Sequence, residues 1–135
     1  MSAKMHKPGL VYFFGLFALI FFENCMSRTL PTEEASVWSK IRLDFKHIDE
    51  NGLTGPDDGK VAVDYEFCIP RDEKLWKKVQ KIDRTAQKST SRGRIGCTSE
   101  QWLVIGTTHQ ENYKRVLYDL ASLPEIVRIE QAFYE

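Results

Sequence analysis

The chain has 135 residues, and its 19 basic and 19 acidic side chains give a formal net charge of zero at pH 7. This balance gives no support for nucleic-acid binding, which needs a basic face that displaces counterions from phosphates. The length fits a short leader followed by one domain of ordinary size.

Residues 1–27 have the character of a targeting segment. Two lysines precede an almost charge-free apolar run from Gly9 to Phe22, and a glutamate and an asparagine close the run. This order predicts a secretory signal peptide. The run is shorter than the roughly 20 apolar residues of a spanning helix, although residues 9–26 form an alternative, uncleaved membrane anchor. We therefore expect an extracytoplasmic domain, periplasmic or secreted, that meets a membrane only through this segment.

Residues 28–59 precede the strongest structural patterns, and we interpret them as an N-terminal arm. They contain a short helical pattern at 33–40, a brief alternating run at 41–45 and a turn-rich stretch at 49–59. We expect this arm to cover the sheet face that the helices leave open.

The first strong patterns of the domain are a strand followed by a helix. From Val61 to Ile69 the odd positions are apolar, which is the period of two of a half-buried strand. Residues 71–83 then carry apolar side chains at helical spacing, with two carboxylates in the first turn, where the helix dipole favours them.

The rest of the domain repeats the alternation of strands and helices. Residues 87–95 are polar and suit an edge strand, 96–99 form a turn, and 101–107 are rich in the branched and aromatic residues of a central strand. A second amphipathic helix is predicted at 110–123, and a last strand at 125–133.

The order over residues 60–135 is thus strand, helix, strand, strand, helix, strand. It predicts an α+β, ferredoxin-like βαββαβ fold, with a four-stranded antiparallel sheet and two helices on one face. The C-terminal sequence Leu120–Glu130 (LASLPEIVRIE) also resembles the end of subtilisin propeptide-type inhibitors. That family has a ferredoxin-like fold and a tail that enters the protease cleft, so the resemblance implies a protease as partner.

Two cysteines, Cys68 and Cys97, remain after a leader of 27 residues. An even number of cysteines in an oxidising compartment favours one disulfide, and the predicted topology places both at the same end of the sheet. Two separate buried thiols are the alternative. A Cys97 nucleophile would need a base, but His109 lies about ten extended residues away, roughly 3.3 Å each, beyond the third strand. We therefore predict no catalytic residue and no enzymatic activity.

The predicted edge strand contains the one candidate ligand site. Ser91, Arg92 and Arg94 offer a hydroxyl and two guanidinium groups for a phosphate, sulfate or carboxylate, although such charges also protect an edge strand from unwanted pairing. The acidic residues between Asp49 and Asp58 lack the glycine and oxygen ligands of a calcium loop at the required spacing. No metal site and no cofactor are predicted.

These patterns lead to one preferred function and two alternatives. The preferred interpretation is an exported, non-enzymatic binding module that docks a protein partner by its sheet edge or open face. The alternatives are a sensor of anions or small metabolites that uses Arg92 and Arg94, and a propeptide-like protease inhibitor.

Overall fold

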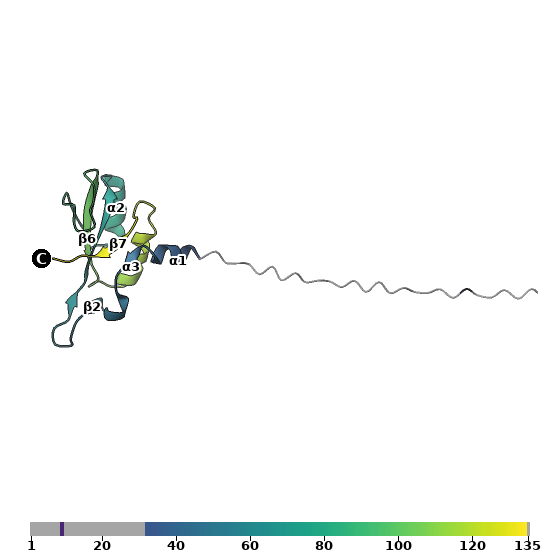
Figure 1. Ribbon diagram of the computed structural model, residues 1–135, viewed down its shortest axis with the longest axis horizontal. Helices are drawn as coiled ribbons and strands as arrows, with labels where there is room; N and C mark the ends of the chain where they lie inside the picture. Colours follow the sequence, from purple (N-terminus) through teal and green to yellow (C-terminus); the bar gives the residue numbers. More distant parts are fainter. Residues whose placement is uncertain (1–8, 10–31, 135) are drawn as a thin grey trace, which may run out of the picture.

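The computed structural model describes Gly9 and residues 32–134, so the predicted signal peptide or anchor lies almost entirely outside the described residues. The chain forms a mixed α+β domain (Figure 1). Its elements are α1 (Glu33–Trp38), β1 (Ile41–Arg42), a 3₁₀ turn (Phe45–His47), β2 (Leu53–Thr54), β3 (Val61–Ala62), β4 (Asp64–Pro70), α2 (Glu73–Ile82), β5 (Gln87–Ser89), β6 (Gln101–Thr107), α3 (Tyr113–Ala121) and β7 (Ile129–Gln131).

The main sheet has five strands in the order β1-β7-β4-β6-β5. Neighbouring strands from β7 to β5 are antiparallel, whereas β1 pairs with β7 in parallel, with Ile41 opposite Ile129. The prediction of a four-stranded, wholly antiparallel sheet is therefore not confirmed, because the arm contributes a fifth strand that is parallel to its neighbour. A contact between distant parts of the chain holds the arm there: the backbone N–H of Ile129 donates to the carbonyl of Lys40 at 2.8 Å, beside the β1–β7 pairing.

The principal core lies between one face of the sheet and the helices. The alternating residues Tyr65, Phe67 and Ile69 of β4 are fully buried there, together with apolar side chains of α2 and α3. Asp72 caps α2 by accepting the backbone N–H of Lys74 at 2.8 Å, which explains why the helix begins where the sequence indicated. Trp76 of α2 is buried as well.

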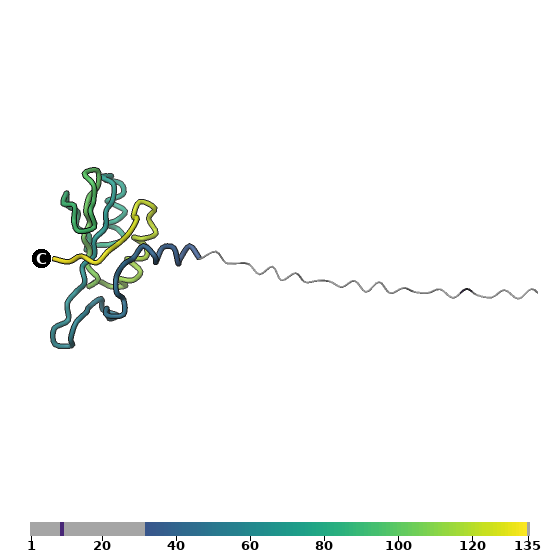
Figure 2. The backbone as a smooth tube through the Cα atoms, viewed as in Figure 1, coloured from purple at the N-terminus to yellow at the C-terminus, as the bar shows by residue number. Residues whose placement is uncertain are grey.

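The arm does not cover the open face of the sheet, contrary to our expectation. Val37, Ile41 and Ile48 join the helix-side core instead, and Phe45 stacks on Tyr113 of α3. The chain from β2 to β3 forms a separate two-stranded sheet that projects from one end of the domain (Figure 2). The face of the main sheet opposite the helices is therefore covered by a segment other than the arm.

Candidate functional site

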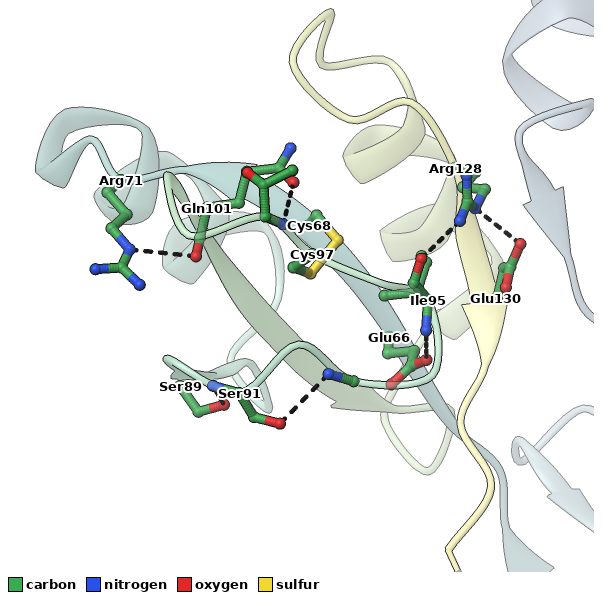
Figure 3. The surroundings of a disulfide bond; sticks show 12 residues. Glu66, Cys68, Arg71, Ser89, Ser91, Ile95, Cys97, Gln101, Arg128 and Glu130 are labelled. Atoms are coloured by element: carbon green, nitrogen blue, oxygen red, sulfur yellow. Dashed lines mark hydrogen bonds and ion pairs between the residues drawn. A yellow bond between two sulfur atoms is a disulfide. The ribbon is translucent and has the colours of Figure 1, made fainter.

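The segment that covers the open face is the loop between β5 and β6, and a disulfide fastens it there. Cys68 of β4 is bonded to Cys97, with an S–S distance of 2.07 Å and a Cα–Cα distance of 5.5 Å (Figure 3). The predicted pairing is confirmed. Cys97 is fully buried and packs with Ile95 and Leu103 in a second, smaller apolar cluster. The predicted edge strand ends early, at Ser89, because the chain leaves the sheet to form this loop.

A buried carboxylate holds the middle of the loop. Glu66 of β4 is only 5% exposed, and its Oε1 accepts the backbone N–H of Ile95 at 2.6 Å. On the other side of the loop, the Arg128 guanidinium donates to the carbonyl of Ile95 at 2.7 Å and also pairs with Glu130 (Figure 3). The loop is therefore tied to β4 and to the segment entering β7, independently of the disulfide.

Gly93 allows the loop to approach the sheet closely. Its φ of +61° lies in the left-handed region that favours glycine. A Cβ atom at this position would lie 2.7 Å from the Leu103 side chain and 2.8 Å from Oε2 of Glu66. The loop is thus in van der Waals contact with the sheet at this point.

The three residues predicted to bind an anion lie together on this loop, and all three are exposed. The hydroxyl of Ser91 accepts the backbone N–H of Gly93 at 3.3 Å, so part of its bonding capacity stabilises the turn. Ser91, Arg92 and Arg94 border one side of a groove of about 570 Å³.

The opposite side of this groove is the C-terminal segment, which we name the aromatic end: Ala132, Phe133 and Tyr134. Phe133 is 59% exposed and Tyr134 is 68% exposed, although both are large aromatic side chains. Tyr134 donates its hydroxyl to Asp64 at 3.0 Å, and partial burial together with this carboxylate raises the pKa of the phenol. Leu103, Ile105 and Glu66 also line the groove.

The groove continues into a second hollow of about 330 Å³ beside β5. Both hollows are lined by Ile105 and Tyr134, and the second is also lined by Gln87, Lys88 and Ser89 of the edge strand. The open face therefore presents an extended depression that runs from the loop, past the aromatic end, to the edge of the sheet. Sequence reasoning missed Glu66 and the aromatic end, although two consecutive aromatics at the end of the last predicted strand were a visible signal.

A buried polar network lies on the other side of the sheet. The Tyr65 hydroxyl donates to Oδ2 of Asp83 at 2.6 Å, while Oδ1 of Asp83 accepts the backbone N–H and the hydroxyl of Thr85. Gln110 donates to Asp83 at 3.1 Å and to the carbonyl of Thr107 at 2.7 Å. Burial raises the pKa of Tyr65 well above its ordinary value, and the Asp83 carboxylate raises it further.

This network has the composition of an acid–base site but not its accessibility. Tyr65 and Asp83 have no exposed surface, and the carboxylate is already bonded on both oxygens. A general base must reach the proton that it abstracts. The network therefore joins β4, the end of α2 and the entry to α3 as a structural element.

The other chemically reactive residues do not converge. Cys97 is engaged in the disulfide, and His109 is exposed with its Nδ1 3.3 Å from the carbonyl of Asn51. Asp49 caps the turn before β2 and pairs with Lys60 at 3.0 Å. Among the described residues no group of three or more His, Cys, Asp or Glu side chains could hold a metal ion.

Within residues 32–134, no helix has the length and apolar character needed to cross a bilayer. Comparison of the chain with protein-family models, with curated proteins and with solved structures gives no match in any of the three.

Proposed function

We propose that this chain is a small, exported, non-enzymatic binding module that docks a protein partner on the open face of its sheet. The observation that carries the proposal is the groove lined by the loop and the aromatic end, where Phe133 and Tyr134 are exposed and Arg92 lines the same groove. Aromatic residues and arginine are the types that contribute most to protein–protein binding energy. An exposed pair of large aromatics beside a groove indicates a surface that a partner covers.

A protein segment fits this groove better than a small anion does. Glu66 lines the groove, so an anion that entered it would approach a carboxylate as well as the two arginines. An extended peptide segment can instead place apolar side chains against Leu103, Ile105 and the aromatic end, and an acidic side chain against Arg92 at the rim. Such a segment could continue along β5, which is one of the two edge strands of the sheet.

The disulfide supports the exported location. Disulfides persist in oxidising compartments and are rare in the cytosol. We also propose that β4 to β7 form a ferredoxin-like unit to which the arm adds β1. The strand order β7-β4-β6-β5, with antiparallel neighbours, supports this assignment. The propeptide-like inhibitor remains a second form of the same proposal, in which the docked partner is a protease.

The proposal is tested by site-specific photocrosslinking. A benzoyl-phenylalanine replaces Phe133 in one variant and Val61 in another; Val61 is 60% exposed and lies in the two-stranded sheet away from the groove. Both variants are incubated with the extracytoplasmic fraction of the host. We expect a discrete protein adduct at position 133 and none at 61.

Competition separates specific docking from chance contact. Unlabelled wild-type protein should suppress the adduct, whereas a Phe133→Ala/Tyr134→Ala competitor should not. An Arg92→Gln competitor should suppress it less well than the wild type. Equal adducts at both positions, or suppression by the double variant, would refute docking at the groove.

Calorimetric titration with phosphate and sulfate tests the anion sensor, and inhibition of subtilisin tests the protease inhibitor.

A further inference from the structure

A second surface, on the far side of the sheet from the groove, carries a concentrated positive charge. We name it the lysine face of α2; its members are Lys74, Lys77, Lys78 and Lys81, all of which are exposed. They stand at positions i, i+3, i+4 and i+7 and so share one side of the helix, while Leu75, Trp76 and Val79 bury the other side. Arg84 follows directly after the helix and is also exposed.

Among residues 32–134, no acidic side chain pairs with the lysine face. Within the part of the chain that the structure describes, none of the four ammonium groups forms an ion pair or a side-chain hydrogen bond. Two pairs of like charges stand four residues apart on the helix, Lys74 with Lys78 and Lys77 with Lys81, and such pairs destabilise a helix. The helix therefore keeps these charges at a cost to its own stability.

The one glutamate that could relieve this repulsion is engaged elsewhere. Glu73 precedes Lys77 by four residues, which is the favourable orientation for an ion pair on a helix. Instead, its Oε1 bonds Nζ of Lys88 on β5 at 2.8 Å. Lys88 is itself held over the Trp102 ring, 3.7 Å from the centroid, and lies 5.2 Å from that of Trp76. The aromatic rings thus hold the Lys88 ammonium group where it pairs with Glu73, and Glu73 does not pair with Lys77.

The shape of the surface indicates what kind of anion it suits. None of the hollows described above, nor those beside α3, is lined by a lysine of this face. None of these hollows therefore offers a small anion a concave site on the lysine face, whereas an extended anionic surface can contact all four lysines along about 10 Å of helix. Since the whole chain is neutral, the positive potential is local to this face.

We propose that the lysine face of α2 docks on the anionic headgroups of a lipid bilayer. Clusters of four or more lysines on one helix face bind anionic membranes by electrostatic attraction. The exposed side of α2 offers neither aromatic nor aliphatic side chains, so the contact is peripheral and salt-sensitive rather than inserted. The apolar run in residues 9–22 addresses the same chain to a membrane, which favours lipid over nucleic acid as the polyanion.

Lysine acetylation footprinting of the full chain tests this proposal. The chain is bound to vesicles of pure phosphatidylcholine, or of phosphatidylcholine with about one third phosphatidylglycerol. Acetylation rates at single lysines are then measured by mass spectrometry on protein recovered with the vesicles. Lys46, Lys60 and Lys114 lie outside α2 and serve as internal controls in the same molecules. An apolar leader would attach the chain to both kinds of vesicle, so attachment itself is not the readout.

In phosphatidylglycerol vesicles we expect the four lysines to react about fivefold more slowly than in neutral vesicles, which corresponds to about 1 kcal/mol per lysine at an anionic surface. The controls should not change, and 0.5 M salt should abolish the protection. A Lys77→Gln/Lys78→Gln variant should show reduced protection at Lys74 and Lys81. Equal rates in both vesicles would refute the proposal. Protection by duplex DNA, but not by phosphatidylglycerol, would also refute it and identify a nucleic acid as the partner.

Discussion

Removal of the disulfide should lower the stability of the domain by an amount that the chain-entropy model gives directly. Cys68 and Cys97 are separated by 29 residues. Closing a loop of this length removes about 12 cal/mol/K of entropy from the unfolded chain, which is about 3.6 kcal/mol at 25 °C. Glu66 and Arg128 also hold the loop at Ile95, so we expect the loop to keep its position in the folded variant. The whole loss of stability should then come from the greater entropy of the unfolded chain.

The assay is urea unfolding of a Cys68→Ala/Cys97→Ala variant against the disulfide-bonded protein. Both carry Cys25→Ala, so that no third thiol can exchange with the disulfide. A urea slope of about 2 kcal/mol/M predicts a midpoint lower by about 1.8 M. Reduction of the parent protein should give the same midpoint as the variant. A loss of less than about 1 kcal/mol would refute this reasoning, because it would show that the bridge does not restrict the unfolded chain.

Two further predictions concern the residues that position the sheet. Gly93→Ala should destabilise the domain by about 1–3 kcal/mol, since it places a Cβ at positive φ against Leu103 and Glu66. Gly96→Ala, at φ +80° but in open space, is the matched control in thermal unfolding. Equal losses of stability in the two variants would contradict the close approach of Gly93 to the sheet. The pKa of Tyr65 in the folded protein lies above its unfolded value of about 10. The contribution of Tyr65 to the free energy of unfolding is therefore complete below pH 10 and falls by up to about 1.4 kcal/mol per pH unit above pH 10. Denaturation between pH 9 and pH 11 should show this loss in the wild type, and Tyr65→Phe should remove it from the pH dependence; an unchanged slope would contradict a raised pKa.

The sequence predicted those parts of the fold that have a regular period and a buried face. The alternation of Tyr65, Phe67 and Ile69 marked the central strand, and Asp72 marked the start of α2. The predicted topology favoured the pairing of Cys68 with Cys97, because it placed both at one end of the sheet, and the structure confirms the bond. Each of these signals is local, or needs only the order of the elements.

The remainder depends on contacts between distant segments, which have no period. β1 has two residues and exists because Lys40 and Ile129 meet. Glu66 alternates with apolar residues as a solvent-facing charge would, yet it is buried because a loop some 30 residues away brings it a backbone N–H. The groove could not be predicted for the same reason: its two sides, the loop and the aromatic end, are both irregular.

The parallel pairing of β1 with β7 has a mechanical consequence. The N-terminal part of the chain enters β1, and the aromatic end leaves β7 in the same direction. A partner pulling on Tyr134, against a tether before β1, would draw the two strands past each other lengthwise. Their backbone bonds and the 3.0 Å pair between Arg42 and Glu130 would then be loaded together in shear rather than opened one after another. Tension applied along the chain between a point before β1 and the aromatic end would thus meet the β1–β7 pairing in shear.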